Sequence, residues 1–321
     1  MIDSRTRRIL QRIAEEHDEG AVVTVAGVRD RYAALMASNG PGPQMCEIEQ
    51  HRIGPLGLPV QVLRPVRHPL AVVVFLHSGG WVAGSLGDTE TVARKLAERS
   101  GCVLVVPEYR LAPENPFPAA IDDAVEALKW ADANRYRLVG DHAPEVCVAG
   151  EGAGGNLAAA AALRAAADGT PGIGLQILIS PILDCGQQGA TADLARTEPG
   201  LLSQPLLDLC IAEYLPEPDD RQLAEASPAR AAALDGLPPT VILATEDELP
   251  AGATDDFARL LRAAGVHVQV QRYRGLTHGA FSVLRVPIGE KPFQGFVRAA
   301  RAYAARPDHP FPRTADQDTL V

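Results

Sequence analysis

Three stretches of the chain carry groups that could act together on a carbonyl compound. Residues 77–81 (HSGGW) follow an apolar run, and residues 150–155 (GEGAGG) separate an apolar run from an alanine-rich one. Later, acidic residues at 246–248 (EDE) precede a histidine within 276–279 (LTHG). Glycine lets backbone N–H groups approach a substrate oxygen closely, and a histidine held by a carboxylate is a general base. The set predicts chemistry that builds negative charge on an oxygen.

Gly152 stands where a catalytic serine would be expected. The pattern G-x-S-x-G between a strand and a helix presents a nucleophilic serine at a sharp turn, and here its central residue is Gly152. The N–H of Ala153, at the start of the next helix, would join those of Gly79 and Gly80 as oxyanion donors. A positive φ at such a turn costs a non-glycine residue about 1–3 kcal/mol, so the turn accommodates glycine readily.

The same stretch matches the dinucleotide-binding pattern G-x-G-x-x-G through Gly150, Gly152 and Gly155. A dinucleotide site needs this pattern in an early strand–helix–strand unit, with an acidic residue ending the next strand. Here the pattern lies in mid-chain, and the next apolar run ends at Ile179 and Ser180. We therefore predict no nucleotide and no other cofactor.

Bulk composition argues against several classes of partner. The chain has 321 residues, 46% of them hydrophobic, and a formal charge of −10. This charge argues against nucleic acid or an anionic membrane as partner, because both are bound through basic patches. No apolar run approaches the roughly 20 residues that span a bilayer, and residues 1–20 lack the apolar centre of a signal peptide. Five scattered cysteines, with no metal-ligand spacing, favour reduced thiols, a cytoplasmic location and no metal site.

Apolar runs alternate with helical patterns along most of the chain. Strands are expected at 47–52, 58–64, 71–77, 103–107, 145–149, 175–179, 240–244 and 266–273, and helices at 5–17, 89–99, 119–133, 155–167, 250–264 and 292–304. Continuous Val/Ile/Leu strands separated by helices predict a parallel sheet that is covered on both faces. Such sheets build their sites at the carboxyl ends of the strands, where the three chemical stretches would meet.

We predict a single domain over residues 1–321. The expected parts are a catalytic core at about 46–199 and 233–305, a helical cap from about 1–45 and 200–232, and a loose tail at 306–321. The cap would cover the carboxyl edge of the sheet.

The chain resembles the hormone-sensitive-lipase-like family of α/β-hydrolases over roughly residues 45–305. The resemblance is carried by residues 77–81, 109–120 (YRLAPENPFPAA), 154–159 (GGNLAA) and 277–279 (THG). It implies an α/β-hydrolase fold, in which an eight-stranded, mostly parallel sheet is flanked by helices and carries a helical cap. A homodimer is compatible with the resemblance but is not decided by it.

The resemblance also implies roles for individual residues. It places an oxyanion hole at Gly79, Gly80 and Ala153, a base at His278 and an orienting acid at Glu248, in the chain order elbow, acid, histidine.

Three positions depart from the family pattern. Gly152 replaces the serine, Glu248 replaces the usual aspartate, and Ser78 replaces a glycine of the H-G-G-G stretch. A one-residue slip in the alignment would make Asp247 the acid. Ser78 is an alternative nucleophile, although its place on the oxyanion loop does not require it to face His278.

Our leading hypothesis is a nucleophile-free enzyme that uses the His–acid pair and the oxyanion hole. It would catalyse elimination, isomerisation, cyclisation or water attack on a small apolar carbonyl or ester compound. Two alternatives stay open. The protein could be a non-catalytic small-molecule receptor or pseudoenzyme, or a conventional carboxylesterase that acts through Ser78 or whose serine at position 152 is altered in this copy.

Overall fold

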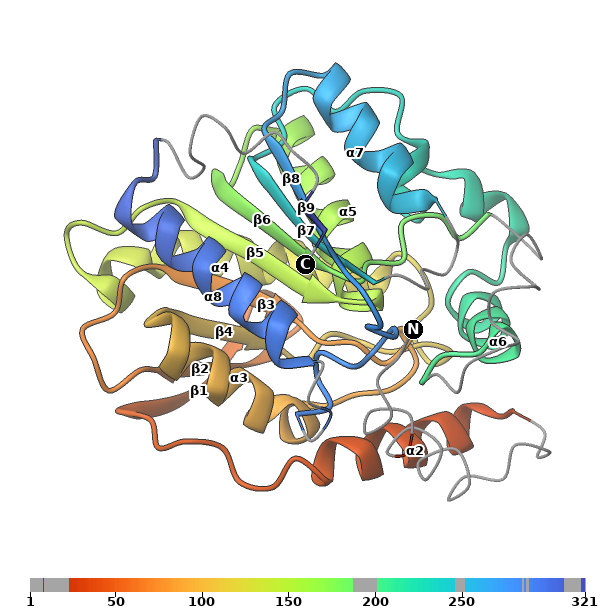
Figure 1. The fold of residues 1–321 in the computed structure, drawn as a ribbon, viewed down its shortest axis with the longest axis horizontal. Coiled ribbons are helices and arrows are strands. Elements are labelled where there is room, and N and C mark those ends of the chain that lie inside the picture. Colours follow the sequence, from red (N-terminus) through yellow and green to blue (C-terminus); the bar gives the residue numbers. More distant parts are fainter. Residues whose placement is uncertain are drawn as a thin grey trace.

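The computed structural model describes residues 8, 23–186, 201–245, 252–284, 286, 289–308 and 319–320. In this part of the chain a central sheet is covered by helices on both faces (Figure 1). The strands are β1 (Glu47–Ile53), β2 (Leu58–Arg64), β3 (Val72–Leu76), β4 (Val103–Pro107), β5 (Val146–Glu151), β6 (Ile173–Ile179), β7 (Thr240–Thr245), β8 (Val268–Tyr273) and β9 (Thr319–Leu320). The helices are α2 (Val25–Ala37), α3 (Leu86–Ser100), α4 (Ala119–Val139), α5 (Ala153–Asp168), α6 (Gln204–Tyr214), α7 (Ala253–Ala263) and α8 (Glu290–Ala305), with 3₁₀ turns η1 (Pro218–Gln222) and η2 (Pro228–Arg230).

The sheet has the order β1-β2-β4-β3-β5-β6-β7-β8-β9 within the described residues. Strand β2 pairs antiparallel with both β1 and β4, and every pairing from β4 onward is parallel. The predicted α/β-hydrolase fold with eight mostly parallel strands is therefore confirmed. The two-residue strand β9 extends the far edge beside β8.

The central strands are apolar on both faces because helices cover both. In β3, the side chains of Val72, Val74 and Leu76 join the core beneath α4, α5 and α7. Val73 and Phe75 point the other way, into the core beneath α3 and α8, where the ring of Phe75 meets that of Phe296 edge-on at 6.5 Å. Because side chains alternate along a strand, β3 contributes to a separate core on each face of the sheet. These two cores hold the strands in place.

Two helices that lie outside these layers border the carboxyl edge of the sheet (Figure 1). Helix α2 was not predicted from the sequence; its valines and glycine are weak helix formers, but the side chain of Thr24 caps it by accepting from Gly27 N at 3.2 Å. The helix expected at 5–17 lies almost entirely outside the described residues. Helix α6 lies within the segment at about 200–232 that the sequence predicted to belong to the cap.

The stretch at 109–120, which carries part of the family resemblance, anchors the loop after β4. The guanidinium of Arg110 makes a two-pronged ion pair with Asp123 of α4, with N–O distances of 2.9 Å for Nε and Nη2. The backbone N–H of Arg110 also donates to this carboxylate, at 2.8 Å. Because the Asp123 side chain is only 6% exposed, the pair locks the loop onto the helix.

We expect Asp123→Ala to lower the free energy of unfolding by about 1–3 kcal/mol, because it leaves partly buried donors of Arg110 without their acceptor. Urea denaturation at neutral pH measures the change. Asp256→Ala is the matched control, since Asp256 pairs with Arg259 on the exposed surface of α7 and such pairs contribute about 0–1 kcal/mol. Equal losses in the two variants would contradict this assignment.

Candidate active site

The turn between β5 and α5 has the geometry of a nucleophile elbow. Gly152 has a φ of 56° and a ψ of −115°, a conformation that L side chains rarely adopt. Its N–H donates to Ile179 O at 2.9 Å, and its carbonyl accepts from Asn156 N at 3.0 Å. The helix that follows, α5, packs so closely against the sheet that a Cβ at Gly154 would lie only 2.0 Å from Leu76 O. Only glycine fits at this position.

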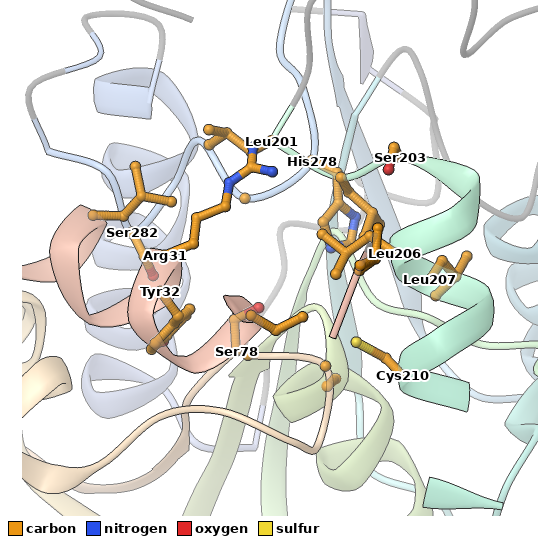
Figure 2. A pocket seen from close by; sticks show the side chains of 18 of the residues that line it. Arg31, Tyr32, Ser78, Leu201, Ser203, Leu206, Leu207, Cys210, His278 and Ser282 are labelled. Atoms are coloured by element: carbon orange, nitrogen blue, oxygen red, sulfur yellow. The ribbon is translucent and has the colours of Figure 1, made fainter. Parts of the chain in front are cut away.

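A pocket of about 900 Å³ opens above this turn. Its walls are Arg31 and Tyr32 from α2 and Leu206, Leu207 and Cys210 from α6 (Figure 2). Its floor is formed by residues at or just beyond the strand ends, namely Ser78, Gly79, Gly80, Glu151, Ala153 and His278. The largely apolar walls and the polar floor suit a small ligand that carries one reactive polar group.

Ser78 and His278 converge on Gly152 from two different loops. A Cβ at position 152 would lie 2.7 Å from Ser78 Oγ and 3.0 Å from His278 Nε2. Gly152 itself is buried, whereas Ser78 and His278 line the pocket. The tertiary structure thus brings together three residues that the sequence singled out, with the side chains of Ser78 and His278 next to the same point beside the elbow.

His278 is held as a neutral imidazole by its surroundings. The residue is 8% exposed, and burial lowers its pKa to about 4, so the neutral form that can accept a proton predominates above about pH 5. The two acid candidates, Asp247 and Glu248, lie outside the described residues. Their pairing with His278 therefore stays a prediction.

The loop after β3 presents backbone N–H groups to the pocket. Gly79, Gly80 and Trp81 all have positive φ angles, of 116°, 63° and 62°. The left-handed conformation of Trp81 is strained, and the residue is held there by full burial and by stacking on Tyr214 at a ring separation of 4.8 Å. Within the described residues no hydrogen bond occupies the N–H of Gly79, Gly80 or Ala153. These groups could donate to a substrate oxygen.

His77 supports this loop from below. Its Nδ1 lies 2.6 Å from Ser78 O, so this nitrogen carries the hydrogen and donates to the carbonyl. The ring stacks on Tyr109 at 4.2 Å, and the Tyr109 hydroxyl donates to His77 O at 2.9 Å. Complete burial lowers the pKa of His77 to about 4. His77 is a neutral structural residue that fixes the backbone of Ser78.

Glu151 is a site residue that the sequence reasoning missed. It ends β5 directly before the elbow, has no exposed surface and lines the pocket floor. Its carboxylate accepts hydrogen bonds from the Ser282 hydroxyl and from the backbone N–H groups of Phe281 and Ser282, on the loop that carries His278. Burial raises its pKa to about 7. A single acid at the end of an otherwise apolar strand was the signal available in the sequence.

Two other kinds of site find no support in the described part of the chain. No group of three or more His, Cys, Asp or Glu side chains there is placed to hold a metal ion. None of its helices is long and apolar enough to cross a membrane. All five cysteines are free, and four of them are buried.

Comparison with known proteins places these features in one family. A sequence profile of the alpha/beta hydrolase fold matches residues 73–282. Carboxylesterase NlhH of Mycobacterium tuberculosis is 35% identical over 270 residues, which cover 80% of this chain and 83% of that protein. The structure of the hyperthermophilic esterase from the archaeon Pyrobaculum calidifontis superimposes with a TM-score of 0.84 at 30% identity, covering 94% of this chain and 99% of the esterase.

One relative is named as a receptor rather than an esterase. The gibberellin receptor GID1 of Oryza sativa subsp. japonica is 30% identical over 224 residues, which cover 68% of this chain and 63% of the receptor. Sequence similarity of this degree therefore extends to a protein named for binding a ligand.

The raised pKa of Glu151 predicts a pH-dependent cost of folding. The native state holds this proton more tightly than the unfolded chain, whose carboxyl titrates near 4.5. The stability that the protonated group contributes is therefore complete below pH 4.5 and is lost as the pH rises through about 7. Glu151→Gln removes the charge and keeps an acceptor. We therefore expect the free energy of unfolding of the variant, minus that of the parent, to be about 2–3 kcal/mol larger at pH 8 than at pH 4.5.

Urea unfolding at several pH values measures this difference. Glu98→Gln is the matched control, because it removes the same charge from the exposed surface of α3. A stability difference between Glu151→Gln and the parent that stays constant from pH 4.5 to pH 8 would contradict the assignment.

Proposed function

Because the chain belongs to the hormone-sensitive-lipase-like family of α/β-hydrolases, we propose that it is an enzyme in which His278 acts as general base on a small, mostly apolar ester or carbonyl compound, with no nucleophile at position 152. The observation that carries the proposal is the position of His278 Nε2, 3.0 Å from the point where a Cβ of residue 152 would lie, on the floor of the pocket. We favour hydrolysis because relatives such as Carboxylesterase NlhH are named as esterases. Elimination, isomerisation and cyclisation would use the same groups.

In this proposal the substrate carbonyl oxygen is bound by the N–H groups of Gly79, Gly80 and Ala153. The three residues line the same floor as His278. The N-terminus of α5 also carries a partial positive charge that favours an anion. An oxyanion donor contributes about 3–4 kcal/mol to transition-state stabilisation, so these groups would retain much of an esterase's binding of the developing charge.

The proton would be removed by His278. A well-placed general base contributes about 10²–10⁴ in rate, and the buried imidazole is already in the neutral form. Glu248, or Asp247 in its place, would orient the ring through its other nitrogen. Without a serine at position 152, His278 must act on an oxygen or a carbon that another part of the site or the substrate provides.

The walls of the pocket set the proposed substrate class. Leu206 and Leu207 of α6 and Tyr32 of α2 surround the space above the floor (Figure 2). Helices α2 and α6 would form the cap that selects the ligand. A short, uncharged acyl or alkyl group would gain about 25 cal/mol for each Å² of apolar surface that these walls remove from water.

We expect His278→Gln to reduce the hydrolysis of p-nitrophenyl acetate by about 100-fold or more, because it removes the base and keeps the size of the side chain. Release of p-nitrophenolate measures the rate, and an unchanged urea midpoint verifies the fold. His142→Gln, at an exposed turn, is the matched control and should match the parent. Unchanged turnover in His278→Gln would refute the proposal.

Restoring the family residues tests whether the rest of the site is correctly placed. Gly152→Ser alone would crowd the Ser78 hydroxyl, since the new Cβ would lie 2.7 Å from it. We therefore expect the double variant Gly152→Ser/Ser78→Gly to hydrolyse p-nitrophenyl acetate at least about 100-fold faster than the parent, and faster than Gly152→Ser alone. If neither variant hydrolyses the ester, His278 or the oxyanion donors are misplaced.

A small-molecule receptor is the second candidate function, favoured by the similarity to GID1 and by the glycine at position 152. A receptor would bind a ligand in the same pocket and release it chemically unchanged. Because a receptor does not turn over its ligand, the parent would show no hydrolysis and His278→Gln could not reduce it. Recovery of bound compounds by mass spectrometry, before and after incubation, separates the two functions.

A further inference from the structure

We propose that Ser78 supplies the hydroxyl that Gly152 lacks, and that His278 activates it as the nucleophile. The sequence alone shows an exchange: the elbow has glycine where the family has serine, and the loop after β3 has serine where the family has glycine. The structure shows that these two positions meet. This inference rests on the proposed function and names the attacking oxygen within it.

The geometry places the hydroxyl in the vacated space. Ser78 Oγ lies 2.7 Å from the point that a Cβ of residue 152 would occupy, and His278 Nε2 lies 3.0 Å from the same point. No hydrogen bond joins these two side chains, and catalytic contacts are often long until the substrate binds. The shared position puts nucleophile and base on the same side of the elbow.

Ser78 also faces the pocket. It is partly exposed and lines the floor, while Gly152 is buried. The N–H groups of Gly79 and Gly80 follow it in the chain, and that of Ala153 begins α5 across the elbow. A carbonyl carbon approached by Ser78 Oγ would therefore have its oxygen near donors that are fixed in place.

The backbone of Ser78 is held rigidly, as a nucleophile requires. The carbonyl of Ser78 accepts from His77 Nδ1 at 2.6 Å, and the stacked Tyr109 ring holds His77 in turn. Downstream, Ala112 N donates to Trp81 O at 3.0 Å, and the indole stacks on Tyr214. With the backbone held, rotation about the Cα–Cβ bond sets the position of the hydroxyl oxygen.

The reaction balances with a carboxylic ester and water. His278 Nε2 takes the proton of the Ser78 hydroxyl as Oγ bonds to the ester carbonyl carbon, and the carbonyl oxygen becomes the oxyanion. The bond from this carbon to the alcohol oxygen then breaks, and the alcohol leaves with the proton from His278. Water attacks the acyl-serine with His278 again as base, which releases the carboxylic acid and restores the Ser78 hydroxyl.

Diethyl p-nitrophenyl phosphate tests the inference, because it transfers a diethylphosphoryl group to an activated serine and releases p-nitrophenolate. We expect one adduct per chain in the intact mass, located by peptide mapping at Ser78. The adduct should be absent from Ser78→Ala and should form about 100-fold more slowly in His278→Gln. Ser38→Ala, in a serine outside the pocket at the end of α2, should be labelled like the parent.

Hydrolysis of p-nitrophenyl acetate by the same proteins distinguishes the ways of failing. If turnover requires His278 but Ser78→Ala keeps it and no adduct forms at Ser78, the inference is overturned while the proposed function stands, with water attacking directly. If the parent neither hydrolyses the ester nor forms the adduct, both fail. The double variant Gly152→Ser/Ser78→Gly shows that the probe reaches the pocket, and urea midpoints exclude unfolding as the cause of a lost adduct.

Discussion

The first turn of α5 is packed against the carboxyl ends of β3 and β5 more closely than any side chain would permit. A Cβ at Gly154 would lie 2.0 Å from Leu76 O, and one at Gly150 would lie 2.1 Å from Gly154 O. This contact places the N-terminus of α5 beside the loop that follows β3. The backbone donors of the site depend on it, because it brings the N–H of Ala153 and the loop at 77–81 to one side of the sheet.

The close packing also explains why an exchange of serine and glycine between two loops can preserve a hydroxyl at one place. Residues 78 and 152 are far apart in the sequence, but their side-chain positions converge within 2.7 Å. Glycine at position 152 relieves the strain of a positive φ. The hydroxyl on the neighbouring loop then costs no such strain, since it sits before the positive-φ residues Gly79, Gly80 and Trp81.

Much of the fold could be predicted from the sequence. The eight main strands appear close to the predicted positions. The central strands β3 to β7 were predictable because β-strands buried on both faces are almost continuously hydrophobic. Helix α2 was missed because Val25 and Gly27 weaken its first turn, although most of its other residues favour a helix. Only the fold shows what holds it in place, such as the Arg29 guanidinium, which donates to Val82 O at 2.8 Å. Glu151 was missed as a site residue, because only the fold shows that it is buried against the loop of His278.

The sequence by itself determined the family, the order of the strands along the chain and the glycine at position 152, because these depend on residue types and on their local spacing. Tertiary structure alone decided that Ser78 and His278 meet at Gly152, that His77 supports the loop of Ser78, and that burial keeps both imidazoles neutral. The physical reason is that distances between loops and the loss of solvent around a side chain arise only when separate strands and helices pack together.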